Sequence, residues 1–256
     1  MIKVLFEHSI FLHQKVGGVS NYIIQINQKL KNYNIDSKII AFLSINKKLD
    51  KTSSHKTYLR FEKIPKFCRK FFYIFNDFFF LIYLKLFKSD LVHFSFYNNK
   101  LMNSLNVPYI LTVYDLISER FQFSNYQFKK KELLDKAKHI ICISNFKKSE
   151  LIKIYGVSEK KISVVYLGVD KTKVDLKKEK KKLILFVGDR DRYKNFERFI
   201  TAFSSSEYLI KNFEIVCFGG GKFNEKEKVI FNDLKISQKV FYRFGDDIYL
   251  KDFYEQ

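Results

Sequence analysis

Residues 183–199 form the stretch that most restricts the fold of this chain. An unbroken apolar run at 183–187 ends at Gly188, and a short charged loop leads to apolar residues at helical spacing from Phe196 onward. This succession predicts a buried strand, a tight turn and a helix. A loop that leaves the carboxyl end of a parallel strand lies where open α/β sheets bind ligands, and the following helix directs its free N–H groups there. We therefore expect an α/β fold with a ligand site at this loop.

The charges in this loop indicate the kind of ligand. Arg190 and Lys194 lie between the predicted strand and helix, and the helix adds the positive end of its dipole. Together they predict an anion site, and phosphate is the anion we expect. Asp189 and Asp191 form a DxD pattern that could hold a divalent cation beside a sugar nucleotide, but so short a pattern also arises by chance. We expect no metal here.

Short apolar runs alternate with helical patterns along much of the chain. After the first predicted strands, at 3–6 and 37–43, the next are at 91–94, 109–113, 139–143 and 163–166. A helix follows at 146–155, with Ser144 or Asn145 placed to cap it and Gly156 to end it. Alternation of this kind predicts βαβ units and a doubly wound parallel sheet.

A Lys-rich polar stretch divides the chain into two expected domains. We expect an N-terminal Rossmann-like domain at 1–170, a linker at 171–182 and a C-terminal Rossmann-like domain at 183–256. After the strand at 183–187, the second domain has strands at 213–218 and 239–242 and helices at 225–234 and 246–254. A doubly wound domain usually has five or six strands, so we expect a fragment or a reduced form.

The charge of the chain is a weak guide to its partners. Lys and Arg together number 47 against 27 acidic residues, which gives +20 and suggests nucleic acid, anionic membrane or acidic substrate. Only seven of the 47 are Arg, the residue that bidentate base or phosphate recognition favours. We therefore expect no specific nucleic-acid binding.

The most apolar passage, residues 67–87, raises the question of a membrane. Asn76 and Asp77 fall in its middle, and a buried carboxylate would be costly in a spanning helix, so we expect no transmembrane segment. Two interpretations of this passage are possible: a long core helix, or an aromatic amphipathic helix that lies on an anionic bilayer. A partly buried helix would be compatible with both.

Several familiar sites are absent from the sequence. It has no GxGxxG, HExxH, GxSxG or zinc spacing, and Gly221-Lys222 fails as a P-loop because Phe223 follows where Ser or Thr is needed. Cys68, Cys142 and Cys217 form no CxxC pair, which favours buried reduced thiols. The first residues lack the pattern of a signal peptide, so we expect a cytosolic protein.

Four segments in register resemble glycosyltransferase family four. They are Gly17-Gly18-Val19-Ser20, residues 112–116 (TVYDL), residues 137–170 and residues 186–196 (FVGDRDRYKNF). The resemblance implies a GT-B fold of two Rossmann-like domains, the second incomplete here. It also implies transfer of a sugar from a nucleotide-sugar donor with retention of configuration and without a metal or other cofactor.

On the donor side, the resemblance implies a role for each matching residue. Gly17 and Gly18 match a glycine pair that lies against the donor phosphates and sugar, although a lone Gly-Gly can equally be a plain turn. Gly188 precedes the basic pair, Arg190 and Lys194, which matches the cations that neutralise the departing diphosphate. Gly219, Gly220 and Gly221 match a loop that closes one side of the nucleotide pocket.

The remaining matches lie in the first domain. Tyr114 and Asp115 match the position that faces the sugar and the acceptor, and Ser144 is a candidate for donor-sugar contact as well as a helix cap. The resemblance thus names Arg190, Lys194, Asp115 and Tyr114 as catalytic candidates.

The resemblance thus implies a retaining transferase in surface polysaccharide or lipopolysaccharide assembly. It would use a GDP-, UDP- or ADP-linked sugar and a glycan or lipid-linked acceptor, and would lie in the cytosol or at the inner face of the membrane. Family members continue with a glycine-rich loop and two glutamates eight positions apart, which do not follow Gln256, so we expect a truncated chain that could be inactive. A non-catalytic GT-B half that binds a partner or membrane is the alternative, and a sequence-independent nucleic-acid binder is a third.

Overall fold

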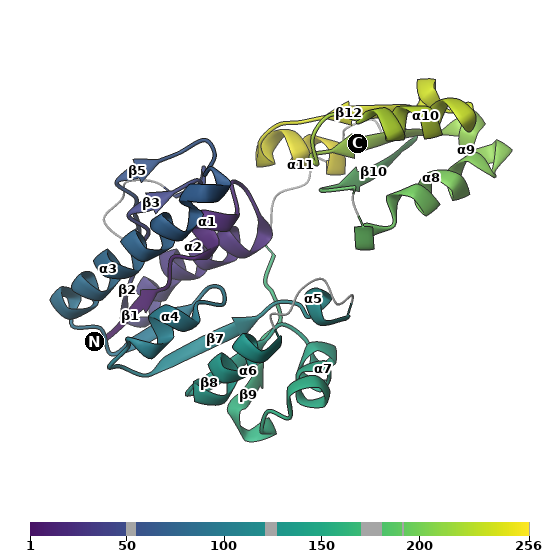
Figure 1. Ribbon diagram of the computed structural model, residues 1–256. Coiled ribbons are helices and arrows are strands. Elements are labelled where there is room, and N and C mark those ends of the chain that lie inside the picture. Colours follow the sequence, from purple (N-terminus) through teal and green to yellow (C-terminus); the bar gives the residue numbers. More distant parts are fainter. Residues whose placement is uncertain (50–54, 121–126, 170–180, 191, 256) are drawn as a thin grey trace. The chain divides into compact units, whose positions relative to one another are not determined.

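The computed structural model describes residues 1–49, 55–120, 127–169, 181–190 and 192–255 (Figure 1). It divides into two compact units, Met1–Gly168 and Val169–Gln256. Of the predicted linker, 171–180 lie outside the described residues, as does Asp191.

The first unit alternates strands and helices. Its strands are β1 (Ile2–Phe6), β2 (Ile35–Ile40), β3 (Leu43–Ser44), β4 (His55–Lys56), β5 (Leu59–Arg60), β6 (Leu91–Phe94), β7 (Tyr109–Val113), β8 (His139–Cys142) and β9 (Ile162–Val164). Its helices are α1 (Ile10–His13), α2 (Gly18–Leu30), α3 (Arg69–Phe87), α4 (Asn99–Asn103), α5 (Ile117–Arg120), α6 (Gln127–Lys136) and α7 (Asn145–Tyr155). Short 3₁₀ segments lie at Lys31–Tyr33, Lys66–Cys68 and Glu159–Lys161.

Seven of these strands form one parallel sheet. Their order is β4-β2-β1-β6-β7-β8-β9, while β3 and β5 pair in a separate two-stranded sheet. The chain adds β2 on one side of β1 and β6 on the other, so the strand order reverses at β1. Open α/β sheets form their ligand crevice at such a reversal, outside the carboxyl ends of the strands. The loops after β1 and β6 meet at that place.

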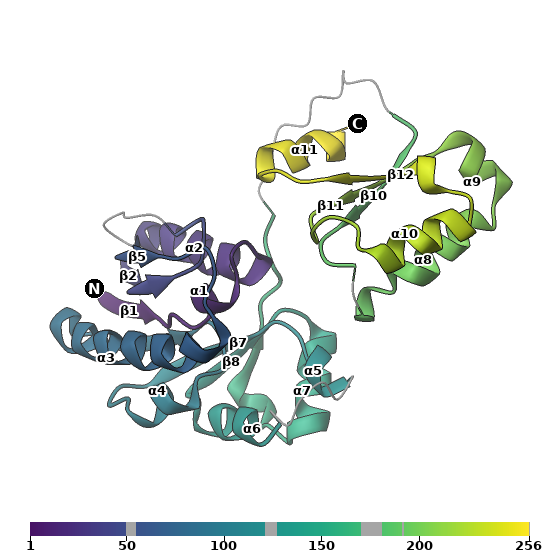
Figure 2. The same ribbon diagram turned by 45° about the horizontal axis from the view of Figure 1, so that its top comes forward.

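Helices cover both faces of this sheet (Figures 1 and 2). On one face, Ile23 and Ile24 of α2 pack in the cluster that contains Phe6 and Ile39. On the other, α3, α4, α6 and α7 pack in a second cluster, in which Phe80 of α3 is fully buried. The doubly wound parallel sheet predicted from the alternation is therefore confirmed.

Local capping explains where α7 begins and ends. The Ser144 hydroxyl accepts a hydrogen bond from the Lys147 N–H at 3.2 Å, and Gly156 ends the helix with φ of 65°. The left-handed region suits glycine, which has no Cβ to clash. Both predictions for this helix are confirmed, with Ser144 rather than Asn145 as the cap.

Helix α3 coincides with the apolar passage that raised the membrane question. Asn76 is buried and binds the backbone of Leu43 twice, accepting from its N–H at 2.7 Å and donating to its carbonyl at 2.9 Å. Within the described residues, no helix combines the length and apolar character needed to cross a membrane. Asn76 instead fixes α3 to β3.

The second unit is a smaller three-layer arrangement. Its strands are β10 (Leu183–Val187), β11 (Glu214–Phe218) and β12 (Val240–Arg243), and its helices are α8 (Phe196–Ser204), α9 (Glu207–Asn212), α10 (Glu225–Asp233) and α11 (Asp247–Glu255), with 3₁₀ segments at Arg192–Lys194 and Ser237–Lys239. The strands are parallel in the order β10-β11-β12. Helices α8 and α10 pack on one face, while Tyr249 and Phe253 of α11 contact Phe218 on the other (Figure 2).

The three cysteines are free thiols, two of them in cores. Cys142 and Cys217 are buried, and Cys68 is partly exposed. Burial raises the pKa of Cys142 to about 11 and that of Cys217 to about 12. A thiol that stays protonated at neutral pH is a poor nucleophile and ligand, in keeping with the structural role predicted for these two.

Candidate functional site

Glycines in the left-handed region form the carboxyl edge of β10 and β11. Gly188, Gly219, Gly220 and Gly221 have φ between 70° and 102°. A Cβ on Gly220 would lie 2.5 Å from the Gly188 carbonyl oxygen and 3.1 Å from Nη1 of Arg190. The two loops therefore approach so closely that only glycine fits at Gly220, and they form one continuous edge.

Arg190 lies inside this edge and is only 8% exposed. Its Nε donates to Oε1 of Glu227 at 2.6 Å, while Nη1 and Nη2 donate to the carbonyls of Gly219 at 3.1 Å and Gly221 at 2.9 Å. The guanidinium also lies 4.8 Å from the centre of the Phe223 ring. Arg190 thus connects the glycine loop to the first turn of α10, and Glu227 compensates its charge.

Lys194 is the exposed cation of the same edge. It ends the 3₁₀ segment before α8, and its Nζ donates to the Val187 carbonyl at 3.2 Å. The same Nζ is 2.5 Å from where a Cβ of Gly188 would be. The structure therefore brings Gly188, the glycine loop and both predicted cations together, but only the Lys194 charge reaches solvent.

The glycine pair of the first unit lies where α2 begins. Gly17 is the N-cap residue, with extended φ of −174°, and Gly18 starts the helix. Oε1 of Gln14 accepts from the Ser20 N–H at 3.0 Å, and the Gln14 side chain fills the space where a Cβ of Gly17 would be. No heavy atom lies within 4 Å of the Cβ position of Gly18. The Ser20 N–H, at the start of α2, is thus already hydrogen-bonded within the protein. The space beside the Gly18 Cα remains open.

Tyr114 and Asp115 follow β7 at the carboxyl edge of the large sheet. The Tyr114 ring packs edge-on against Tyr22 of α2 at 5.5 Å, and its hydroxyl is buried without a hydrogen-bond partner among the described residues. Burial, followed by the Tyr22 hydroxyl, raises the pKa of Tyr114 well above its usual value. Asp115 is exposed and accepts from the Ile117 N–H at 3.2 Å, at the start of α5. The Tyr22 contact connects this loop to the helix that follows Gly17 and Gly18.

A buried polar cluster at the sheet reversal was not predicted. Glu7 and His8 follow β1, and both are fully buried. Oε2 of Glu7 accepts from the Ser95 hydroxyl at 3.0 Å, and Nε2 of His8 is 3.0 Å from Oδ1 of Asp77. Burial raises the pKa of Glu7 despite the opposing effect of His8. An acid and a histidine directly after the first strand were the available signal, but Asp77 lies 69 residues away.

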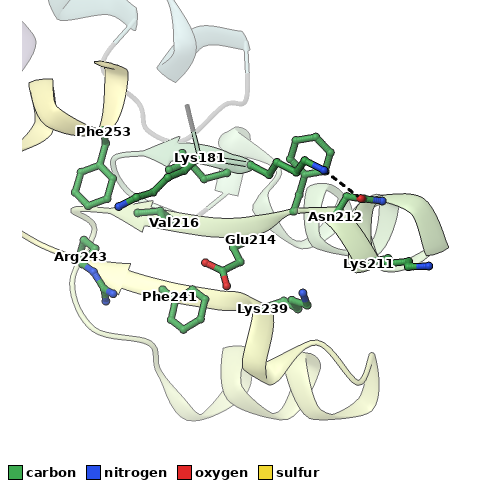
Figure 3. Close-up of a pocket in the computed structure, with 12 residues that line it drawn as sticks. Lys181, Lys211, Asn212, Glu214, Val216, Lys239, Phe241, Arg243 and Phe253 are labelled. Carbon is green, nitrogen blue, oxygen red and sulfur yellow. Dashed lines mark hydrogen bonds between the residues drawn. The ribbon is translucent and has the colours of Figure 1, made fainter. Parts of the chain in front are cut away.

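Two cavities lie in the second unit. One of about 280 Å³ lies between α8 and α10 and includes Arg190, Phe196 and Glu227 in its lining. A larger one, about 660 Å³, lies over the sheet face that carries Val216 and Phe241, with Phe253 of α11 at one side (Figure 3). None of the predicted site residues lines the larger cavity, so it is not part of the candidate site.

Among the described residues, no three or more His, Cys, Asp or Glu side chains gather in a way that could hold a metal ion. The DxD pattern includes Asp191, which lies outside the described residues.

Two units built on parallel sheets, one of seven strands and one of three, are the architecture expected of a GT-B type fold. Solved structures with this fold can be superposed on nearly the whole chain. One is WaaG, a glycosyltransferase involved in lipopolysaccharide biosynthesis, with a TM-score of 0.69 at 14% identity over 98% of this chain and 72% of that one. Another is HepE from Anabaena in complex with UDP and glucose, with a TM-score of 0.65 at 13% identity over 98% and 71%.

Sequence comparison identifies the family. Residues 16–173 match the model of Glycosyltransferase Family 4, and residues 169–256 match that of Glycosyl transferases group 1. The chain belongs to Glycosyltransferase Family 4. It is also 33% identical over 118 residues to the O-antigen chain mannosyltransferase RfbU of Salmonella typhimurium. That match spans 45% of this chain and about a third, 32%, of the relative.

Proposed function

We propose that this chain acts in a retaining glycosyltransferase that moves a sugar from a nucleotide-sugar donor to a glycan or lipid-linked acceptor during surface polysaccharide or lipopolysaccharide assembly. The observation that carries the proposal is the glycine-lined carboxyl edge of β10 and β11 with Arg190 and Lys194 in it. RfbU acts on O-antigen, WaaG in lipopolysaccharide biosynthesis, and HepE holds UDP, which supports the same class of donor and acceptor. The donor nucleotide would be GDP, UDP or ADP.

In this proposal the edge holds the donor diphosphate. Charge builds on the leaving group while the sugar becomes oxocarbenium-like, so fixed positive charge at the diphosphate lowers the barrier. Arg190 and Glu227 together are neutral, so Lys194 supplies most of the counter-charge. Arg190 acts mainly by holding Gly219, Gly220 and Gly221 in place for close approach of the phosphates. This arrangement would stabilise the diphosphate without a metal.

The first unit would supply the residues around the sugar and the acceptor. Tyr114 is protonated at neutral pH, as any tyrosine is, and could donate its unpaired hydroxyl proton to a donor or acceptor oxygen. Asp115 is exposed and could accept from a sugar hydroxyl. Gly17 and Gly18 would lie against the donor, and Ser144 could contact the sugar beside its capping role. An oxygen of the leaving diphosphate would take the acceptor proton in a front-face displacement.

Release of nucleoside diphosphate tests this function. The chain would be incubated with GDP-, UDP- and ADP-sugars and a total lipid extract as acceptor. We expect turnover of one donor class, and a loss of about tenfold or more in Lys194→Met, because one charge at a leaving phosphate is lost. Lys226→Met is the matched control, since Lys226 is exposed and pairs only weakly with Glu197. Equal turnover by both variants would contradict the role of Lys194.

A non-catalytic role is the second candidate. The observation in its favour is that the Arg190 guanidinium is occupied by Glu227 and loop carbonyls rather than open to a ligand. A binding module of this kind would show no affinity for any nucleotide sugar at millimolar concentration. We also propose a cytoplasmic location with a peripheral contact to an anionic membrane.

A further inference from the structure

Helix α3 exposes a continuous apolar stripe. One side of the helix packs in the core through Phe72, Asn76, Phe80, Leu84 and Phe87, which are buried. On the other side, Phe71, Ile74, Phe78, Ile82 and Leu86 are 60%, 50%, 58%, 39% and 75% exposed. Their spacing of three or four residues places them in one row along the helix axis. A stripe of this length is larger than the scattered apolar residues of an ordinary surface.

The exposed rings of the stripe are held by their neighbours. Phe71 packs against Phe75 with centroids 5.7 Å apart, and Phe78 packs against Phe79 at 5.3 Å. Phe75 and Phe79 contact each other at 4.7 Å, and Phe79 stacks on Phe42 at 4.0 Å. The stripe is therefore part of a packed aromatic layer and does not need to unfold to present its apolar side.

Basic residues stand at both ends of the stripe. Arg69 and Lys70 lie at the start of α3 and Lys85 and Lys88 at its end, and all four are exposed. None of them forms an ion pair with a described carboxylate. The only acidic residue of α3, Asp77, points inward, accepting from Nδ2 of Asn98 at 2.8 Å and lying 3.0 Å from Nε2 of His8. The exposed side of the helix thus carries apolar groups and positive charge without a negative one.

We propose that α3 docks the protein on an anionic lipid bilayer, lying in the plane of the interface. Aromatic and aliphatic side chains on one helix face, with Lys and Arg beside them, are the composition of interfacial helices. Each cation near an anionic surface adds to the attraction. A second copy of this chain would bring the same cations against these, so the charge favours lipid over self-association. The helix lies on the outside of the first unit in both views (Figures 1 and 2), and the exposed fractions of its side chains show that the stripe is accessible within that unit.

This inference does not rest on the transferase function, because vesicle binding is measured without donor or acceptor. We expect the chain to sediment with vesicles of phosphatidylglycerol and phosphatidylcholine. Phe78→Ser/Ile82→Ser should weaken this partition by about tenfold or more, since two inserted side chains are lost. The matched control is Tyr33→Ser/Ile154→Ser, which removes residues that are 74% and 42% exposed elsewhere in the same unit. All four residues are exposed, so the variants should fold.

The charge component has its own pair of variants. Lys70→Gln/Lys85→Gln should weaken binding to anionic vesicles by roughly tenfold, whereas Lys153→Gln/Lys160→Gln, on α7 and after it, should not. Pure phosphatidylcholine vesicles should bind the wild type much more weakly. The proposal is overturned if the wild type does not bind anionic vesicles, if each α3 variant binds as well as its control, or if the stripe instead mediates a dimer that Phe78→Ser/Ile82→Ser abolishes.

Discussion

At the scale of single residues, Arg190 both holds the glycine loop and forms a buried ion pair with Glu227. Its position after β10 could be predicted, because a cation at the carboxyl end of a buried strand suggests an anion site. Its burial against Glu227 could not, because the partner lies 37 residues away and the pairing depends on how α10 packs. The charged pair is mostly desolvated, with side chains 4% and 13% exposed.

The Arg190–Glu227 pair gives a stability prediction. Glu227→Gln should destabilise the second unit by about 2 kcal/mol or more, because it leaves the buried guanidinium without a counter-charge. Glu225→Gln, in the same helix, should cost less than about 1 kcal/mol, since its pair with Lys228 is exposed. Hydrogen exchange of the β10 and β11 amides measures both. Equal effects would show that the pair does not stabilise the loop.

His93 gives a prediction about pH. It lies in β6 and is only 4% exposed, its Nε2 is 2.8 Å from Oγ1 of Thr112, and burial lowers its pKa to about 4. The unfolded chain binds a proton near pH 6.5 while the folded one does not, so stability is lost as the pH falls from 6.5 to 4. At pH 4.5, His93 alone should lower the free energy of unfolding by about 2 to 3 kcal/mol.

Urea unfolding at pH 7 and pH 4.5 measures this share. His93→Gln should lose less stability between the two pH values than the wild type. His139→Gln, at a partly exposed position that contacts Ser163, should keep the wild-type dependence. An unchanged dependence in His93→Gln would mean that another group whose pKa is lowered by burial, such as His13, determines the acid response.

At the scale of elements, the long periodic segments could be predicted and the shortest could not. Strands β6, β7 and β10 have the bounds expected from their apolar runs, and α8 starts at Phe196 as predicted. The two-residue strands β3, β4 and β5 are too short to show a period of two. Helix α9 was not predicted either, because its six residues span less than two turns.

Helix α3 gives a prediction in which two residues of the same type differ only in the side they face. Phe80→Ala should destabilise the first unit by about 3 to 5 kcal/mol, because Phe80 is fully buried in the core. Phe78→Ala should change stability by about 0.5 kcal/mol or less, because that ring is 58% exposed. Thermal or urea unfolding measures both. A large loss in Phe78→Ala would mean that the stripe stabilises the fold instead of serving as a free surface.

At the scale of the whole molecule, each unit has candidate residues at the carboxyl edge of its own sheet. The first unit presents Gly18, Tyr114 and Asp115 at the carboxyl edge of its large sheet, and the second presents Lys194 and the glycine loop at its own. Parallel topology explains this, because it gathers loops distant in sequence at one edge. The fold class and this edge could be predicted from alternation and glycine positions. The cluster of Glu7, His8 and Asp77 could not, because it joins β1 to the middle of α3.

Calorimetric titration with UDP, GDP and ADP tests the central claim that the β10–β11 edge binds the diphosphate of a nucleotide sugar. The wild-type chain should bind at least one of them with a dissociation constant of about 1 mM or lower, and Lys194→Met should weaken it by about tenfold while Lys226→Met does not. No binding of any of the three at millimolar concentration, or equal binding by Lys194→Met, would contradict this account.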